Sequence, residues 1–442
     1  ESVEEIIMAL FIIGLVCSLG LLGYLVYFLF KYVKKCEKTI DKKTNFILMG
    51  LVIGVGITTI LSSLGLVLMN SWSLKFLEFL ALILGSFVLG FAAAGTITAF
   101  VLHYWSIELD KKIKKVCKTL FICGFIATIL GLWLFSEGIA NQDIYPLFNR
   151  IDFTYGLTRP GQNVGDSFGI QFYGIIIVCG ALVCFFITDH YTYKKFGEHG
   201  LIDTLFIVAF LAGVIGSRLW YCLILEPEYF LANPGEIVTG IVNGGLAIQG
   251  GALGGAIVGI AFVLIFRKYI DVRFLMDVAI PTILIAQAIG RWGNFLNNEV
   301  HGLEVSAKYF EWLPTIIRNN MAHSSTEGMT SPGNIYVPLF IIESLINFGG
   351  FFFIRFFLGK VCKFRIGTGY QASAYFVWYG TVRAILEPFR AGDFEYTQSI
   401  VASFIIIGIG VAMFIFMFTF HNIRMKKGIE DMNGDKIKTQ KA

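Results

Sequence analysis

Charged residues are scarce in this sequence. Only 15% of its 442 residues are charged, whereas 56% are hydrophobic and the mean hydropathy is +0.72. A soluble domain carries about 25% charged residues, so ordinary cytosolic, disordered, coiled-coil and collagen-like proteins are excluded. The net charge is only +4, and the basic residues fall mainly in short loops and the tail, so nucleic acid is not expected as a partner. The composition is typical of an all-α polytopic membrane protein, which has the lipid bilayer as a partner.

The sequence also lacks the cysteine spacings of metal and disulfide sites. None of its eight cysteines forms a CxxC pair, and no His/Cys cluster has metal-ligand spacing. Most of the cysteines fall in apolar runs, where a cysteine behaves as a small hydrophobic residue. We therefore expect no disulfide framework, no metal site and no cofactor.

Long apolar runs recur along the chain. The first is too long for a signal-peptide core and lacks a small-residue cleavage pattern, so it is expected to be a retained helix. The pattern predicts about eleven transmembrane helices, at roughly 6–30, 46–69, 76–104, 117–136, 169–188, 202–224, 244–266, 274–293, 337–358, 371–390 and 399–420.

Lysine and arginine are concentrated in every second loop. Basic segments such as 31–43, 111–118 and 360–365 alternate with loops that are mainly acidic or neutral. Because positive charge marks the cytoplasmic side, the N-terminus is expected outside and the C-terminus in the cytoplasm. An odd number of spans requires the same arrangement.

The distribution of ionisable residues divides the chain into regions. The four spans within 1–136 contain almost none at depth, which predicts an accessory bundle without a site of its own. An outward segment with prolines and glycines, 137–164, is expected to be a linker. The region 165–425 is expected to hold seven helices with an outward head segment at about 299–336, followed by a polar cytoplasmic tail at 426–442.

Several charged residues fall at bilayer depth in this second region. A charge at such a depth costs about 2.5–3.5 kcal/mol on insertion scales, so a group of them indicates a functional site. These residues are Asp203, Arg218, Asp277, Arg291, Glu343, Arg383, Glu387 and Arg390.

One cluster follows a helical repeat at the end of the tenth span. Arg383, Glu387 and Arg390 are spaced i, i+4 and i+7, which places them on one helix face, and Tyr379 extends the stripe by a turn. Pro388 is expected to kink this helix at the site. In the alternative interpretation Arg383 and Glu387 only neutralise each other, which leaves the other arginines unexplained.

A second polar stripe ends the eighth span. Gln287, Arg291, Asn294 and Asn298 share a face if the helix continues past residue 293. They overlap the run GRWGNFLNNEVHG at 290–302, in which glycines allow close approach while Arg and Asn offer donors to an anion. The pattern favours the wall of a polar pocket, and a capping or loop-ordering role is the alternative.

Glycines crowd the start of the seventh span. The spacing of Gly250 and Gly254 is typical of closely packed membrane helices. Gln249 is a polar side chain among these glycines and is expected to face the pocket.

These residues carry a resemblance to a known family. The run 290–302 closely resembles the signature of bacterial phosphatidylglycerol–prolipoprotein diacylglyceryl transferases, and the similarity extends over about residues 165–420. The family has a seven-helix core in the plasma membrane with an outward N-terminus, so spans five to eleven resemble it and the first four have no counterpart. The other matching stretches are QFYG at 171–174, GSR at 216–218, the glycine block 244–255, Glu343-Ser344, and 379–390 with Gln398 beyond it.

The resemblance implies a reaction. The diacylglyceryl group of phosphatidylglycerol moves to the lipobox cysteine of a prolipoprotein, forming a thioether and releasing glycerol phosphate. The nucleophilic thiol belongs to the substrate peptide, so the enzyme need not supply a cysteine. Arg291 and Arg383 are implied to hold the phosphate, with Arg390 and Arg218 as supporting cations.

The resemblance also implies roles for the remaining residues. Asn294 and Tyr173 are implied to orient the substrate, and Gly302 to give backbone clearance. The glutamates implied to position the arginines are Glu299, Glu343 and Glu387. The further residues implied as catalytic are Asn294, Glu299, Tyr173, Gln249 and Glu387, and those implied to bind substrate are Gly302, His301, Glu343, Gln398 and Gln287.

Three positions depart from the family pattern. Gln249 stands where many members have a histidine proposed as the general base, and glutamine takes no proton at neutral pH, so another base or none acts here. His301 occupies a usually aromatic position, either filling that space or serving as a base that titrates at about pH 6.5. Ile342 replaces a tyrosine. An inactive relative that acts in lipoprotein handling is therefore an alternative.

Two further interpretations stay open at this point. Intramembrane Arg/Glu pairs and broken helices also suit a transporter or flippase with an anionic-substrate site, although no internal repeat relates the first four spans to the rest. The first four spans could also dock a secretion or processing partner beside an unchanged enzyme core.

Overall fold

The structure is a computed structural model, and it describes the chain most completely after residue 168. By their internal contacts the residues group into two compact units, 1–144 with 307–319 and 145–306 with 320–442. The described residues are 16–17, 20–21, 23–24, 27, 50–60, 84–88, 90–91, 94–95, 98, 115, 119, 131, 146–147, 149–152, 156–160, 169–197, 201–239, 245–267, 271–325, 327–390 and 396–429.

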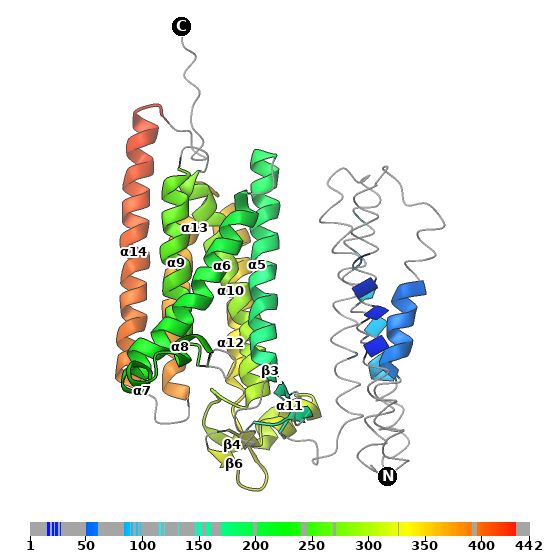
Figure 1. Ribbon diagram of the computed structural model, residues 1–442. Coiled ribbons are helices and arrows are strands. Elements are labelled where there is room, and N and C mark those ends of the chain that lie inside the picture. The colour runs from blue at the N-terminus through cyan, green and yellow to red at the C-terminus, as the bar shows by residue number, and fades with distance from the viewer. Residues whose placement is uncertain are drawn as a thin grey trace. The chain divides into compact units, whose positions relative to one another are not determined.

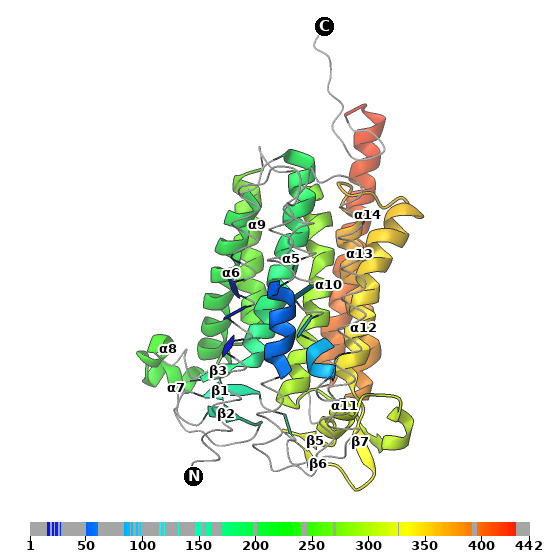
Figure 2. The same cartoon turned by 90° about the vertical axis from the view of Figure 1, so that its right-hand side faces the viewer.

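The second unit is built on a bundle of long helices that stand side by side (Figures 1 and 2). Each of the seven spans predicted after residue 165 coincides with one of them. In the described part of this unit they are α5 (Phe172–Phe196), α6 (Leu201–Trp220), α9 (Ile248–Ile265), α10 (Val272–Asn297), α12 (Leu339–Phe352), α13 (Tyr370–Leu386) and α14 (Tyr396–Lys426).

Five of these helices are long and apolar enough to cross a membrane. Two of the five gain length from π-helical extensions, η2 (Tyr221–Leu225) after α6 and η5 (Phe353–Leu358) after α12. The other two, α9 and α13, are shorter, with 18 and 17 residues. The prediction of an all-α membrane protein is confirmed for this part of the chain.

The four spans predicted within 1–136 lie largely outside the described residues, so the count of eleven stays a prediction. What is described there includes an apolar helix, Gly50–Ile60. The hydroxyl of Thr59 in this helix donates to the carbonyl of Ser86 at 2.8 Å, which ties the helix to the segment 84–91.

Short elements gather at one end of the bundle, the head end, where the strands and two short helices lie (Figures 1 and 2). The two short helices are α7 (Pro227–Ala232) and α8 (Glu236–Thr239). The strands are β1 (Arg150–Asp152), β2 (Gly156–Thr158), β3 (Gly169–Gln171), β4 (Glu304–Ser306), β5 (His323–Ser324), β6 (Gly328–Met329) and β7 (Asn334–Tyr336), and the chain between β4 and β5 contains η4 (Ala307–Phe310) and α11 (Thr315–Asn320). The strand β1 pairs in antiparallel fashion with both β2 and β3, and β3 leads directly into α5, while β4 pairs with β7 and β5 with β6.

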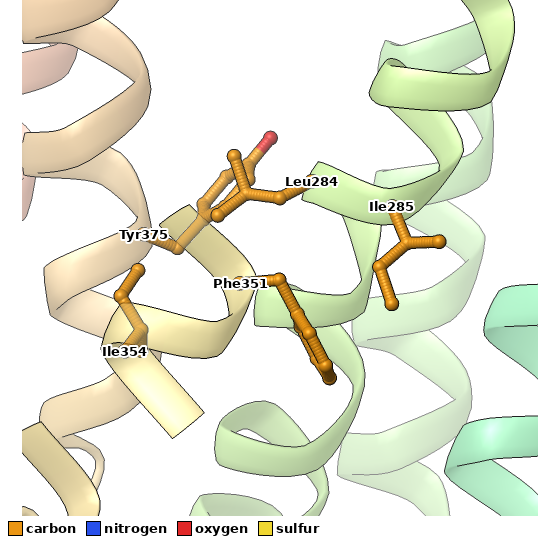
Figure 3. Packing of buried hydrophobic residues seen from close by; sticks show 5 residues of the cluster. All are labelled: Leu284, Ile285, Phe351, Ile354 and Tyr375. Atoms are coloured by element: carbon orange, nitrogen blue, oxygen red, sulfur yellow. The ribbon is translucent and has the colours of Figure 1, made fainter. Parts of the chain in front are cut away.

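The helix α10 is the centre of the bundle, because it packs against α5, α12 and α13. Leu284 and Ile285 of α10 form a buried cluster with Phe351, Ile354 and Tyr375 (Figure 3). A residue on α10 is therefore surrounded by protein on several sides, which makes this helix a suitable carrier for buried polar groups.

The glycines of α9 have the packing role that their spacing predicts. A Cβ atom on Gly216 of α6 would overlap the carbonyl oxygen of Gly250 and lie 3.1 Å from the Cα of Gly254. Only residues without a side chain allow the two backbones to approach so closely. The small-xxx-small prediction for α9 is confirmed.

Two charged residues at depth have structural partners far from the head end. Asp277 of α10 accepts backbone hydrogen bonds from Gly367, Gly369 and Ala372 at 2.9, 2.7 and 3.0 Å, and so caps the start of α13. Arg355 donates to the carbonyl of Val278 at 2.9 Å and to the side chain of Gln371 at 2.8 Å. Asp277 was predicted to belong to a group with a functional role, whereas the structure gives it a capping role.

The ends of two helices differ from the prediction. The helix α10 runs to Asn297 rather than to residue 293. The helix α13 stops at Leu386 instead of continuing with a kink to residue 390, and a 3₁₀ turn, η6 (Glu387–Phe389), follows. Pro388 has no backbone N–H, and its ring clashes with the carbonyl one turn earlier, so it ends the helix here.

Candidate active site

The polar stripe of α10 forms as predicted, because the helix continues through Asn294 to Asn297. Asn298 is the C-cap in the left-handed conformation, with φ 51° and ψ 45°. Its side-chain oxygen accepts a hydrogen bond from Asn320 at 2.7 Å, and its carbonyl accepts from the Ser325 hydroxyl at 2.9 Å. The capping alternative therefore holds for Asn298, which orders the loop between α10 and the head end.

Arginines and glutamates from α10, from α12 and from the end of α13 with the turn η6 after it meet near the head end. The Nε of Arg291 on α10 contacts one carboxylate oxygen of Glu343 on α12. The other oxygen of Glu343 lies 3.0 Å from Nη2 of Arg390. Glu387 pairs with Arg383 at 3.0 Å and lies 3.7 Å from Nε of Arg390. We call these five residues the arginine–glutamate network.

The two carboxylates lie beneath the guanidinium groups. The side chains of Glu343 and Glu387 are 3% exposed, and that of Arg390 is 8% exposed. Those of Arg291 and Arg383 are 19% and 20% exposed. The network contains three cations and two anions, so the accessible guanidiniums carry a net positive charge toward an approaching anion.

Gly302 places Arg390 in this network. After η6 the chain at Arg390 is extended, and it forms an antiparallel bridge with Gly302. A Cβ atom on Gly302 would lie 2.7 Å from Cβ of Val337 and 3.1 Å from the carbonyl oxygen of Phe389. Only glycine fits this position, so backbone clearance is the structural role of Gly302.

A chain of hydrogen bonds continues from Arg291 to the end of α10. Arg291 donates to the side-chain oxygen of Asn294 at 3.3 Å, and the amide of Asn294 donates to Glu299 at 3.0 Å. Asn297 also donates to Glu299, at 3.3 Å. Val300 has φ 56°, which costs about 1–3 kcal/mol for a non-glycine residue. This strained turn follows directly on Glu299.

Tyr173 joins this chain from α5. Its ring lies against Gly293 so closely that a Cβ atom there would overlap the ring. The phenol is near enough to Glu299 and Arg291 to experience both charges. The structure therefore gathers Tyr173, Asn294 and Glu299 beside Arg291 of the arginine–glutamate network.

Arg218 has partners of a different kind. Its guanidinium donates to the backbone carbonyls of Ile237, Gly245 and Glu236 at 2.9, 3.1 and 2.7 Å, and it lies over the ring of Phe230. These bonds tie α6 to α8 and to Gly245 before α9. The supporting role of Arg218 toward the phosphate stays a prediction.

His301 belongs to the head end and is only 3% exposed. Its ring lies 4.1 Å from that of Tyr336, and Nε2 is 2.6 Å from the Ser324 hydroxyl. Burial lowers the pKa of His301 below its usual value. These contacts fit a histidine that fills an aromatic position.

The other predicted residues lie in different surroundings. Gln249 is exposed in the first turn of α9. Gln287 donates to the hydroxyl of Tyr375 at 3.2 Å, one turn farther from the head end than Arg291. The side chain of Gln398 lies outside the described residues. No group of three His, Cys, Asp or Glu side chains suited to a metal ion occurs within the described segments.

Two residues with a part in this architecture were not predicted. Ser399 of α14 accepts a hydrogen bond from Arg383 at 3.0 Å, and nothing in the sequence around it indicates this contact. Arg355 was overlooked within the ninth span, although a single arginine in an otherwise apolar run is a recognisable signal.

Comparison of the sequence with known proteins points to a single family. The family model described as prolipoprotein diacylglyceryl transferase matches residues 162–416. Three curated proteins named phosphatidylglycerol–prolipoprotein diacylglyceryl transferase are similar to the chain. That of Ureaplasma urealyticum serovar 10 is 36% identical over 279 residues, covering 57% of this chain and 79% of its own. Those of Streptococcus pneumoniae serotype 4 and Streptococcus agalactiae serotype Ia are 34% and 35% identical, each covering 56% of this chain and 89% and 92% of their own.

The match includes α5 to α13, all of the arginine–glutamate network and most of α14. It covers more than half of the chain and most of the length of each relative. The chain belongs to the prolipoprotein diacylglyceryl transferase family.

Proposed function

We propose that this protein transfers the diacylglyceryl group of phosphatidylglycerol to the lipobox cysteine of prolipoproteins in a bacterial plasma membrane. One observation carries the proposal beyond the family assignment. Buried Glu343 and Glu387 hold three arginines in place while Arg291 and Arg383 keep about a fifth of their side chains exposed. Such guanidiniums are positioned in advance for a phosphate. The family assignment also favours a transferase over a transporter.

The chemistry requires a stabilised leaving group. The cysteine sulfur forms a bond to the glycerol carbon that carries the phosphate, and the bond between that carbon and the phosphate oxygen breaks. Glycerol phosphate leaves with the bonding electrons, so negative charge builds up on the phosphate. Arg291 and Arg383 stabilise this charge, because planar guanidiniums match phosphate oxygens in geometry. Arg390 is the most buried of the three and serves to hold both glutamates.

The thiol must lose its proton before it attacks. A free thiol has a pKa of about 8.5, and nearby positive charge lowers it. The net charge of the arginine–glutamate network acts in this direction, and the proton goes to water. Gln249 takes no part as a base, and His301 contributes to packing at the head end.

The basic residues indicate the orientation in the membrane. Lys194 and Lys195 end α5, Arg273 begins α10, and Arg424 and Lys426 end α14, all at the end opposite the head end. Positive charge favours the cytoplasmic side, so the head end faces outward. The lipobox peptide then reaches the arginines from outside.

Residues 1–161 lie before the family match. We propose that 1–136 is an accessory four-helix bundle that docks a secretion or processing partner. The segment 137–164, predicted as a linker, also contributes β1 and β2 to the head end. The scarcity of ionisable residues at depth supports a packing or docking role over a catalytic one.

The direct test is a transfer assay with the purified protein. Phosphatidylglycerol and a lipobox peptide are incubated with the enzyme, and the mass of the peptide is measured. We expect the peptide to gain one diacylglyceryl group, and a peptide in which serine replaces the cysteine to stay unchanged. An unmodified cysteine peptide, in the presence of folded protein, would contradict the proposal.

A further inference from the structure

A layer of buried polar atoms lies directly beneath the arginine–glutamate network. On α10, Gln287 is one turn farther from the head end than Arg291, and on the antiparallel α12, Asn347 is one turn farther than Glu343. Because Arg291 contacts Glu343, the two amides lie at one level, about 5.4 Å deeper. The Ser344 hydroxyl donates to the carbonyl of Ala288 at 2.9 Å, which fixes the register.

The polar atoms of this layer are short of partners. Among the described residues, Oδ1 of Asn347, Oε1 of Gln287 and Nε1 of Trp378 are buried and have no hydrogen-bond partner. Asn347 is only 2% exposed. The indole nitrogen of Trp378 on α13 lies against Gly350, about one turn deeper than Asn347. A buried polar atom without a partner is costly, so three such atoms within about one turn of one another along the bundle point to a ligand.

The interior changes polarity with depth in a fixed order. Charged guanidiniums come first, the two amides come second, and the indole nitrogen of Trp378 lies deeper, at about the level of Leu284 and Phe351. A phospholipid held with its phosphate on the arginines presents the same order. Its ester groups lie on the chain side of the phosphate, and its alkyl chains lie beyond them.

We propose that Asn347 and Trp378 bind the ester carbonyls of the diacylglyceryl group and so select diacyl over dialkyl lipids. The indole N–H is a donor, and the amide of Asn347 supplies a donor when its oxygen and nitrogen are exchanged, an assignment set by the partner present. The two ester carbonyls of one lipid accept from one donor each. This inference rests on the transferase function proposed above, and it identifies the residues that select the lipid substrate.

The test compares two lipids that differ only in these carbonyls. Diacyl phosphatidylglycerol and its dialkyl ether analogue are offered with the lipobox peptide, and kcat/KM is measured for each. We expect the natural protein to prefer the diacyl lipid by at least about tenfold, as the loss of two buried hydrogen bonds implies. Asn347→Leu and Trp378→Phe should each lower this ratio by about fivefold, through slower use of the diacyl lipid alone.

Ser373→Ala is the matched control. Its hydroxyl is equally buried on α13 but donates to Gly369 of the same helix at 2.9 Å, so the ratio should stay as in the natural protein. An equal ratio in the natural protein and both variants would overturn the proposal, as would equal use of the two lipids by the natural protein. If the natural protein modified no peptide with either lipid, the transferase function itself would fail. Dialkyl transfer shows that each variant is folded, and Trp378→Phe decides the question if Asn347→Leu does not fold.

Discussion

Glu343 joins Arg291 to Arg390, the two arginines of the site that are farthest apart in the sequence. One carboxylate oxygen contacts Nε of Arg291, and the other lies 3.0 Å from Nη2 of Arg390. The carboxylate comes from a third segment, α12, and is almost completely buried. The geometry of the guanidiniums therefore depends on a residue that has no need to touch the substrate.

Replacing this carboxylate by its neutral isostere tests that dependence. Glu343→Gln leaves two guanidiniums facing each other without a buried anion, so we expect a loss of about 3 kcal/mol in the free energy of unfolding. Transfer should fall by about 100-fold, because small displacements of positioning groups are costly in catalysis. Thermal unfolding in detergent and the peptide transfer assay measure the two effects. Glu304→Gln, at an exposed carboxylate of the head end, should leave transfer unchanged, and equal behaviour of the two variants would refute the role of Glu343.

Gly302→Ala tests the placement of Arg390. The added methyl group would lie 2.7 Å from Val337 and 3.1 Å from the Phe389 carbonyl, so the bridge to Arg390 must open. We expect a loss of about 1–3 kcal/mol of stability and at least tenfold slower transfer. Gly349→Ala in α12 is the control, since nothing lies within 4 Å of its added Cβ. Normal transfer by Gly302→Ala would show that Arg390 is dispensable.

His301→Phe separates packing from base catalysis. The ring keeps its contact with Tyr336, so transfer at pH 7.5 should stay within about threefold of the natural protein. Loss of the bond to Ser324 should cost about 1 kcal/mol of stability. A drop in transfer of 100-fold or more, with folding intact, would make His301 the base.

The same variant has a predictable pH dependence. Burial lowers the pKa of His301, so the folded protein binds this proton less readily than the unfolded chain. Its contribution to stability is complete above the unfolded pKa of about 6.5 and is lost as the pH falls toward the lower folded pKa. Between pH 7.5 and 5.5 the melting temperature of the natural protein should therefore fall more than that of His301→Phe. Equal shifts would contradict this assignment.

Removal of residues 1–136 tests the accessory region. The cut precedes Leu147 and Asn149, which bond to Asn320 and Asn297 at 2.9 and 3.2 Å, so β1, β2 and β3 should keep their pairing at the head end. We expect normal transfer in vitro and reduced lipoprotein modification in cells. A longer deletion to residue 152 removes β1 and should destabilise the head end. Loss of transfer in vitro after the shorter deletion would place part of the catalytic unit in the first four spans.

How much of the site could be predicted depends on how far along the chain each sequence pattern carries information. Helical periodicity acts within one segment, and it correctly placed Arg291 and Asn294 on one face of α10. The pairing of Arg383 with Glu387 is also local, since the two are one turn apart. The contact of Glu343 with Arg291 and Arg390 joins three segments. The sequence marked Glu343 only as a charged residue at bilayer depth, and its partners could not be read from spacing.

What the sequence did not show has equally specific causes. Arg218 carries the same charge as the other arginines, but its hydrogen bonds to backbone carbonyls at 236, 237 and 245 cannot be read from that charge. Pro388 was expected to bend a helix, whereas the helix ends there and Arg390 is held by a strand-like bridge. Neither outcome is encoded in spacing along one helix. Both depend on which segment packs against the residue.

The most direct measurement counts products in the transfer assay for Arg291→Ala and Arg383→Ala. The natural protein should release one glycerol phosphate for each peptide that gains a diacylglyceryl group. Each variant should be at least about 100-fold slower, as expected when a group that stabilises charge in the transition state is removed, and should still be folded by its melting temperature. Turnover at the natural rate in either variant would contradict the account.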